Sequence, residues 1–198
     1  MGQRVQAFGQ SMCGIKYVGF TLEIDNKIES PSANFAGLDC WTFFEIALGL
    51  ARMIEVPKTE YRPSDLLKEI EWTRYRGGVS LTGRVCQEMT VLWKSYRYLR
   101  HNPSLLKRMG EIEARESQLP FYYIPKSQVA SIESKIQGGD IIGIVTKHQG
   151  GHCSHVGLAY RGRSGVCHFM HASKKHKKVL IDASLSNYLY EFKSHIGI

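Results

Sequence analysis

The hydrophobic pattern of this chain changes its period once, at the turn Gly138-Gly139. Before this turn, apolar residues recur three and four positions apart, which is the spacing of helices with one buried face. After it, short apolar runs are separated by turn-rich links, which is typical of an antiparallel sheet. Helices followed by strands predict a segregated α+β domain, with helices mostly within 40–110 and strands mostly within 138–183. The length of 198 residues predicts a single domain over 1–198, because a second core would be cramped.

Cap and turn signals set the bounds of the expected elements. Pro57 should end the first helix near Val56, because proline disfavours helical geometry in the residue before it. Ser64 can cap the second helix. The expected helices cover 40–56, 64–70, 85–99 and a short segment near 105–109, and the expected strands cover 141–146, 155–160, 166–171 and 178–182. The segment 118–125 (QLPFYYIP) fits neither a central strand nor an ordinary loop, so it could either line a groove or cover the core.

Cys40 stands where a polar loop turns into the first helical pattern. Asp39 is a good N-cap residue, so Cys40 is expected in the first turn of the helix. Unpaired backbone N–H groups and the positive end of the helix dipole favour a thiolate there, and the thiolate is the nucleophilic form of cysteine. Cysteine is also among the most buried residue types, so the local sequence leaves packing and chemistry equally open.

Two histidines could supply the base that a cysteine nucleophile needs. His155 opens one expected strand, and His171 ends the next. In an antiparallel hairpin the start of one strand lies near the end of the other, so the two imidazoles should be neighbours. We therefore expect His155 to face Cys40 as the base, with His171 behind it to hold the ring in the useful tautomer.

The composition limits the partners. The net charge of +8 favours anionic partners, such as nucleic acid, an anionic membrane surface or the acidic polymers of a bacterial cell wall, although a solvated basic surface explains it equally well. No basic helix interleaved with aromatic residues appears, so we expect no nucleic-acid partner. No apolar run reaches the length of a membrane span. The five cysteines show no CxxC spacing, which excludes a zinc-ribbon or thioredoxin-like signature.

Four motifs, in this order and spacing, resemble the papain-like NlpC-type cysteine hydrolases of bacterial cell walls. They are Leu38-Asp39-Cys40-Trp41-Thr42-Phe43, Gly139-Asp140-Ile141-Ile142, Ser154-His155-Val156-Gly157-Leu158 and His171-Ala172-Ser173. Four further segments resemble the branch whose members act as N-acetylmuramoyl-L-alanine amidases. They are Gly14-Ile15-Lys16-Tyr17 leading to Thr21-Leu22-Glu23, Arg74-Tyr75-Arg76-Gly77, Tyr123-Ile124-Pro125 and Asn187-Tyr188-Leu189. The resemblance covers nearly the whole chain, from about Gly14 to Ile198.

The resemblance implies a papain-like fold, in which a nucleophile at a helix N-terminus packs on a C-terminal antiparallel sheet. It implies that Cys40 is the nucleophile, that His155 is the general base and then acid, and that His171 is the orienting third member. Tyr17 matches the family tyrosine whose hydroxyl could join the Cys40 backbone N–H in an oxyanion hole. The implied activity is hydrolysis of the amide between N-acetylmuramic acid and L-alanine through a thioester. The implied partner is peptidoglycan or a muropeptide, with no cofactor and no metal.

The same motifs carry the expected substrate contacts. Trp41 follows the nucleophile where smaller residues are common in the family, so it could shape the pocket. The arginines at 74 and 76 could bind peptide carboxylates, although exposed solvated charge is the simpler interpretation. The expected substrate-binding residues are Trp41, Arg74, Tyr75, Arg76, Tyr123, Ser154 and Ser173.

Other functions are compatible with the sequence. An endopeptidase that cuts the γ-D-glutamyl to diaminopimelate bond would need the same nucleophile and base, and papain-like lipid acyltransferases are a more distant resemblance. His148, His152, Cys153 and His155 are close enough in sequence to suggest a zinc-binding module, and a wall-binding domain without catalysis is a further alternative. The resemblance implies a periplasmic or extracellular location. The first residues form no apolar signal segment, so a cytoplasmic location stays open, as does the oligomeric state.

Overall fold

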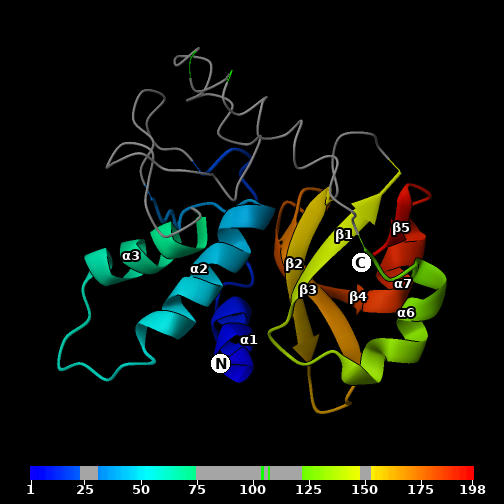
Figure 1. Cartoon of the computed structure of the whole chain (residues 1–198), viewed down its shortest axis with the longest axis horizontal. Helices are drawn as coiled ribbons and strands as arrows, with labels where there is room; N and C mark the ends of the chain where they lie inside the picture. The colour runs from blue at the N-terminus through cyan, green and yellow to red at the C-terminus, as the bar shows by residue number, and fades with distance from the viewer. Residues whose placement is uncertain (23–30, 75–103, 105–106, 108–121, 148–152) are drawn as a thin grey trace.

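The computed structural model describes residues 1–22, 31–74, 104, 107, 122–147 and 153–198. Its helices are α1 (Gly2–Ser11), α2 (Cys40–Met53), α3 (Pro63–Arg74), α6 (Lys126–Ile132), the 3-10 turn η3 (Glu133–Lys135) and α7 (Leu185–Glu191). Its strands are β1 (Ile141–Thr146), β2 (His155–Arg161), β3 (Cys167–Ser173), β4 (Lys178–Ser184) and β5 (His195–Gly197). Helices and an antiparallel sheet make a mixed α+β fold, which confirms the predicted class (Figure 1).

The described strands form one antiparallel sheet in the order β4-β3-β2-β1-β5. Strands β1 to β4 match the predicted runs closely, because β-branched and apolar residues bounded by turns define them in the sequence. β5 is an addition, since three residues are too few to show a strand pattern. It pairs with β1 through Val145 and Thr146, on the edge opposite β4.

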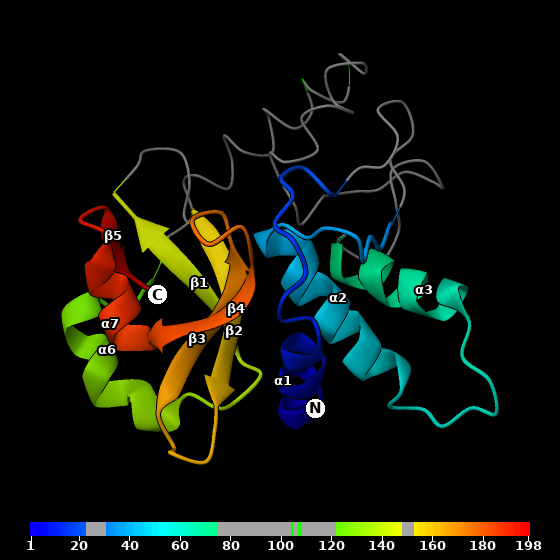
Figure 2. The same cartoon turned by 180° about the vertical axis from the view of Figure 1, so that it is seen from behind.

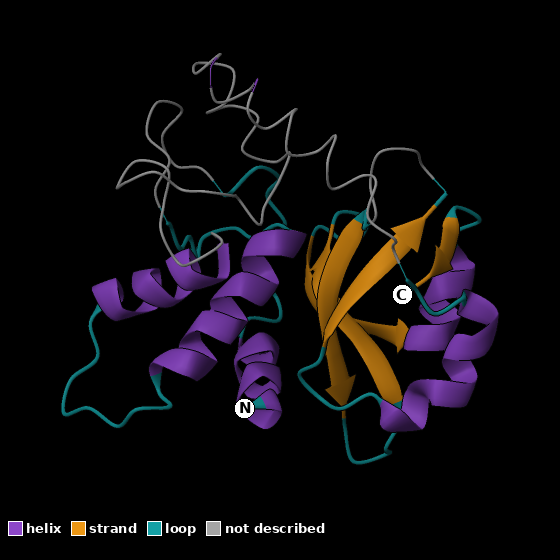
Figure 3. Cartoon of the chain, in the orientation of Figure 1, coloured by secondary structure: helices purple, strands orange, loops and turns teal. Residues whose placement is uncertain are grey.

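Alternating side chains of the sheet enter two cores, one on each face. On one face, Val156 and Leu158 of β2 pack with the helices α1 and α2, and α3 lies against α2. On the other face, Ala159 and Phe169 pack with α6 and α7. Figure 3 shows helices on both sides of the sheet. The start of α2 lies against the sheet, which brings residues from distant parts of the sequence together (Figure 1).

The helix α1 precedes every helix that the sequence predicts. Its apolar content is low, and the residues it buries, Val5 and Gly9, do not reveal a helical stripe. A Cβ atom at Gly9 would lie 2.5 Å from Cε of Met170 on β3, so glycine allows α1 to approach the sheet closely. Figure 2 shows α1 alongside α2. The short helices α6 and α7 were likewise not predicted.

The two predicted helices that lie within the described residues are confirmed. α2 begins at Cys40 and ends at Met53, three residues before the predicted end, and α3 covers 63–74. The helix predicted over 85–99 and most of the one predicted near 105–109 lie outside the described residues. Within the described part of the chain, no helix combines the length and apolar character that a membrane span requires.

Candidate active site

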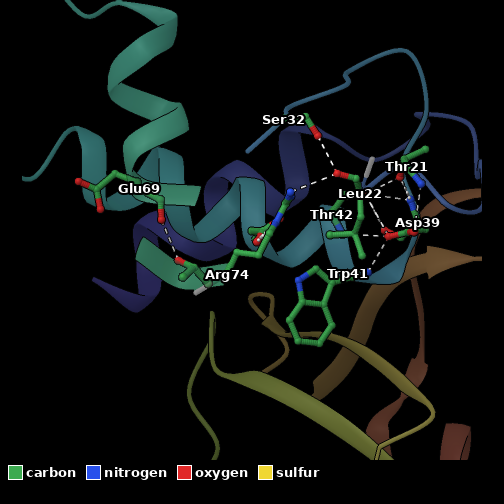
Figure 4. A network of polar contacts seen from close by, with 10 residues as sticks. Thr21, Leu22, Ser32, Asp39, Trp41, Thr42, Glu69 and Arg74 are labelled. Carbon is green, nitrogen blue, oxygen red and sulfur yellow. Dashed lines mark hydrogen bonds and ion pairs between the residues drawn. The ribbon is translucent and has the colours of Figure 1, made fainter. Parts of the chain in front are cut away.

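A reciprocal capping box fixes the N-terminus of α2. Oδ1 of Asp39 accepts hydrogen bonds from the backbone N–H groups of Trp41 (3.0 Å) and Thr42 (2.9 Å), and Oγ1 of Thr42 accepts one from the Asp39 N–H (3.0 Å). Oγ1 of Thr21 accepts from the same N–H at 3.2 Å, so a separate segment joins the cap (Figure 4). Cys40 is the first residue of the helix, as predicted, and is 6% exposed. Its thiol therefore lies at the positive end of the helix dipole.

A short backbone pairing carries Tyr17 to the same place. The N–H of Leu38 donates to the carbonyl of Lys16 (2.9 Å), and the carbonyl of Leu38 accepts from the N–H of Val18 (3.0 Å). Tyr17 thus pairs in parallel with the residue that precedes the N-cap. Tyr17 and Cys40 line one cavity.

The two predicted histidines are neighbours on adjacent strands. Nε2 of His155 lies 2.7 Å from Nδ1 of His171, which is a short hydrogen bond between the rings. The ring centroids are 4.8 Å apart and nearly perpendicular, and Phe169 stacks on His171 at 4.6 Å and meets His155 edge-on at 5.7 Å. The antiparallel pairing of β2 and β3 produces this contact, as the strand pattern predicts.

A third side chain, absent from the sequence prediction, continues the chain of hydrogen bonds. Nε2 of His171 lies 3.2 Å from Oδ2 of Asp182 on β4. The β3–β4 register shifts between His168 and Met170, so β4 carries one extra residue opposite this step. Such a bulge turns a side chain away from strict alternation. Strand periodicity could not reveal Asp182 for this reason.

The protonation of these groups follows from their environment. Burial lowers the pKa of His171 to about 4, although the hydrogen bond that His171 donates to Asp182 opposes this, so the ring is neutral at pH 7. Burial raises the pKa of Asp182, but the N–H of Ala183 and the contact with His171 outweigh it and hold that pKa below its ordinary value. The carboxylate is therefore ionised and only accepts hydrogen bonds.

The hydrogen-bond network then assigns each ring proton. His171 donates from Nε2 to the carboxylate of Asp182, which leaves its Nδ1 as an acceptor. His155 donates to that acceptor from Nε2. The lone pair of His155 consequently resides on Nδ1, and this is the atom that can take a proton from an acid such as a thiol.

A cavity of about 850 Å³ joins these parts. It has the thiol of Cys40 and the rings of His155 and His171 in its lining. The full lining consists of Tyr17, Gly19, Phe20, Asp39, Cys40, Ser154, His155, His171, Ser173, Lys174, Lys175, Asp182, Tyr188, Glu191, Phe192 and His195. An arrangement of a thiol, an imidazole and a carboxylate-linked second imidazole is able to transfer an acyl group and a proton.

The predicted site residues other than Arg74 fall into three groups. Those that line the cavity are Tyr17, Cys40, Ser154, His155, His171 and Ser173. Trp41 packs edge-on against Phe44 at the border of the core, and Tyr123 lies beside β5, so neither belongs to the lining. Tyr75 and Arg76 lie outside the described residues.

Arg74 requires a correction, because it cannot reach a substrate. Its side chain is buried, and its Nη2 lies 2.7 Å from Oε2 of Glu45 on α2. Its Nη1 donates to the carbonyl of Leu22 at 3.1 Å (Figure 4). Burial raises the pKa of Glu45, and the Arg74 guanidinium opposes that shift. Arg74 therefore joins α3 to α2 and to the segment that ends at Leu22.

The cavity also contains residues that the sequence did not single out as functional. Tyr188 of α7 packs edge-on against His171, and burial raises its pKa, so it stays a neutral phenol. Phe20 has a positive φ of 63° and is 62% exposed at the rim. Lys174 follows Ser173 directly, at the turn into β4. The segment Asn187-Tyr188-Leu189 contains Tyr188 but gives it no role, and no motif contains Phe20 or Lys174, because tertiary packing brings these residues to the cavity.

The metal-binding alternative concerns the segment 148–155, of which residues 153–155 are described. Among the described residues, no three His, Cys, Asp or Glu side chains are grouped so that they could hold an ion. Cys153 is exposed, and its thiol donates to the carbonyl of His155 at 3.0 Å. His148 and His152 lie outside the described residues.

Several solved structures share this fold. An N-acetylmuramoyl-L-alanine amidase from Bacteroides uniformis ATCC 8492 superposes with a TM-score of 0.80 at 24% identity, over 99% of this chain and 95% of that one. A putative xylanase from Bacteroides fragilis gives a TM-score of 0.75 at 25% identity, over 97% of each chain. A Legionella pneumophila protein gives 0.65 at 18% identity, over 99% of this chain and 86% of that one.

The family assignment rests on the sequence from residue 79 to residue 198. No curated protein matches the chain. A family described as AmiA-like, N-acetylmuramoyl-L-alanine amidase-like, matches residues 79–198, which is more than half of the length. The chain therefore belongs to the AmiA-like family of N-acetylmuramoyl-L-alanine amidase-like proteins.

Proposed function

We propose that this protein is a cysteine amidase with a papain-like arrangement, which hydrolyses the amide between N-acetylmuramic acid and L-alanine in peptidoglycan fragments. The observation that carries the proposal is the chain of hydrogen bonds from His155 through His171 to Asp182, in the cavity that Cys40 also lines. The family and the similar amidase from Bacteroides uniformis support the choice of bond.

In the first half of the reaction, the thiolate of Cys40 attacks the carbonyl carbon of the lactyl group. The S–C bond forms, and the carbonyl electron pair moves onto oxygen. The hydroxyl of Tyr17 and the backbone N–H of Cys40 are suited to hold this oxyanion. When the intermediate collapses, the C–N bond breaks and the protonated His155 gives its proton to the departing amine of L-alanine. A thioester remains on the enzyme.

In the second half, water hydrolyses the thioester. Nδ1 of His155 takes a proton from the water as its oxygen attacks the same carbonyl carbon. The C–S bond breaks, N-acetylmuramic acid leaves as a carboxylic acid, and the thiolate of Cys40 is restored. His171 and Asp182 hold the imidazole in the tautomer that both steps require.

An endopeptidase would use the same groups on a different amide, so the products must decide. We expect the wild type to release free N-acetylmuramic acid and a peptide beginning with L-alanine from N-acetylmuramoyl-L-alanyl-γ-D-glutamyl-diaminopimelate. Mass spectrometry distinguishes these products from the N-acetylmuramoyl dipeptide and free diaminopimelate that an endopeptidase would give. Cys40→Ala should abolish either reaction, and retained cleavage would contradict the cysteine mechanism.

The xylanase name of one structural neighbour raises glycoside hydrolysis as a second activity. That chemistry ordinarily needs a pair of carboxyl groups across the scissile bond. The acidic residues of the described cavity lining are engaged elsewhere, since Asp39 caps α2, Asp182 bonds His171 and Glu191 pairs with Lys175. The lining thus favours acyl transfer. Release of reducing sugar from xylan by the wild type would reverse this preference.

The proposed substrate belongs to the bacterial cell wall, which lies outside the cytoplasmic membrane. We accordingly place the activity in the periplasm or outside the cell as part of the same proposal. Fractionation of the native protein tests the location, and recovery in the cytoplasmic fraction would point to recycled muropeptides as the substrate.

A further inference from the structure

The described lining of the cavity holds both carboxylates and ammonium groups, and their direct contacts differ. The lining contains three acidic residues, and each has a described partner of its own. Asp39 accepts two backbone N–H groups of α2, and Asp182 accepts from His171. Glu191 pairs with Lys175, which also lies over the ring of Phe192. Among the described contacts, none of these carboxylates forms an ion pair with Lys174.

Among the described residues of the lining, Lys174 is the cation without such a partner. It lines the cavity and is exposed, and within the described part of the chain its ammonium makes no hydrogen bond or ion pair. It stands at the end of β3, three residues after His171 and directly after Ser173. The strand thus positions the backbone of Lys174 beside the site. The exposed side chain can contact a ligand in the cavity.

An exposed ammonium without a direct partner can form a charge-assisted hydrogen bond with an anionic group of the ligand. The corrected position of Arg74 strengthens this point, because the guanidinium is buried against Glu45 and cannot serve. In the proposed substrate the sugar and the lactyl group are neutral, whereas the peptide beyond L-alanine carries carboxylates. The nearest of these is the α-carboxylate of the D-glutamyl residue, which the γ-linkage leaves free.

We propose that Lys174 binds the α-carboxylate of the D-glutamyl residue and makes the enzyme selective for acidic over amidated stem peptides. This inference rests on the proposed amidase function and adds the orientation of the substrate. With this contact, the peptide leaves past the β3–β4 turn, where Lys174 stands.

Two substrates of nearly equal size test the inference, namely N-acetylmuramoyl-L-alanyl-D-glutamate and its D-isoglutamine counterpart. The wild type should favour the carboxylate substrate by about fivefold in kcat/KM, which is the scale of one exposed charge pair. Lys174→Met should remove this preference through a higher KM for the acid, with kcat unchanged. Lys174→Arg should restore much of it, since the charge is kept.

Lys178→Met is the matched control. Lys178 lies on the same hairpin, is exposed and is not part of the lining, so its loss changes the net charge equally. The preference should survive in this variant. An equal loss in both variants would show general attraction by the basic surface and would overturn the contact at Lys174.

The failures of the two proposals can be separated. Cleavage of both substrates by the wild type at equal kcat/KM, or a preference that Lys174→Met leaves intact, would overturn this inference and leave the amidase standing. Absence of cleavage of either substrate would overturn the amidase and this inference with it.

Discussion

At Asp182, the two carboxylate oxygens are both engaged, one by the ring of His171 and the other by the N–H of Ala183 at 2.8 Å. Asp182→Asn keeps the shape and removes the charge. The amide can then donate to His171, which reverses the ring protons and places a proton on Nδ1 of His155. We expect kcat to fall by roughly 100-fold or more at an unchanged unfolding midpoint. Steady-state kinetics and thermal unfolding check both quantities.

His176→Gln is the control for this variant. Nε2 of His176 lies 3.9 Å from the same carboxylate oxygen but makes no link to His155. Its removal should leave kcat within about twofold, because surface contacts of this kind contribute little. An equal loss in both variants would show that Asp182 acts through local charge and not by positioning His171.

His171 also makes stability depend on pH. Its pKa is about 4 in the folded protein and near 6.5 when unfolded, so the unfolded chain binds more protons between these values. Stability is therefore highest above pH 6.5 and falls as the pH drops toward 4, by about 3 kcal/mol from this residue. Urea unfolding at stepped pH measures the slope. His171→Asn should flatten it, and an unchanged slope would contradict the assignment.

The sequence reveals these residues unequally. Cys40 and the two histidines could be predicted, since a capped helix start and the pairing of two strands are local properties. Asp182 could not, because a bulge aims it at His171. Arg74 was misassigned because its partner Glu45 comes from another helix, and nothing local marks a buried pair.

On the scale of elements, the cap of α2 has two roles. Asp39→Ala removes the acceptor of two backbone N–H groups and should cost about 1–2 kcal/mol of unfolding free energy. It should also slow the alkylation of Cys40 by iodoacetamide near neutral pH, because the helix start that favours the thiolate loses its order. Peptide mapping after timed labelling measures the rate at Cys40.

Asp65→Ala supplies the comparison for the cap. Asp65 accepts from the N–H of Arg62 at 2.9 Å in the first turn of α3, so it is a cap-like acidic residue on another helix. Its loss should leave labelling of Cys40 unchanged. Burial raises the pKa of the Cys13 and Cys167 thiols, so both should react more slowly than Cys40 in every variant. Labelling of Cys40 in the wild type more slowly than of Cys13 and Cys167 would refute the activation of Cys40.

Removal of one partner of the ion pair between α2 and α3 should lower the free energy of unfolding strongly, whereas replacement of both partners should lower it much less. Arg74→Met leaves the Glu45 carboxylate buried without its partner, which should cost about 3–5 kcal/mol. The double variant Glu45→Met with Arg74→Met removes both charges and should recover much of that loss. Denaturant unfolding of the two single variants and the double variant measures the coupling.

The exposed pair Lys58–Asp65 provides the reference for this cycle. Its N–O distance of 2.9 Å is close to the 2.7 Å of Arg74 and Glu45, but solvent screens it, so Lys58→Met should have a far smaller effect than Arg74→Met. A double variant no more stable than Arg74→Met alone would indicate that the Leu22 carbonyl, and not the Glu45 charge, is the main partner of the guanidinium.

At the scale of the whole molecule, one sheet separates two cores, so their stabilities should be linked. Ile46→Ala on the α2 side and Leu189→Ala on the α7 side each remove a fully buried side chain and should cost about 2–5 kcal/mol. Both should shift a single transition. Trp41 and Trp72 belong to the α2–α3 side, so their fluorescence should report the distant Leu189→Ala as well. Separate transitions by fluorescence and circular dichroism would indicate two units.

How much of the fold could be predicted follows the length of each pattern. The strands β1 to β4 and the helix α2 have enough periodic residues to be recognised. The additions α1, α6, α7 and β5 are short or weakly apolar, and tertiary packing stabilises them. The class of the fold was thus predictable, whereas the second helical layer, which supplies Tyr188 to the cavity, was not.

The order of the elements has a consequence for biosynthesis. During translation α2 leaves the ribosome before any strand of the sheet, and β5, whose His195 lines the cavity, pairs with β1 last. A nascent chain therefore presents the thiol of Cys40 long before it can align an imidazole beside it. Under the proposed mechanism, the enzyme can hydrolyse amides only after β2 and β3 have paired and aligned His155 and His171. Incomplete chains are therefore inactive toward amide bonds.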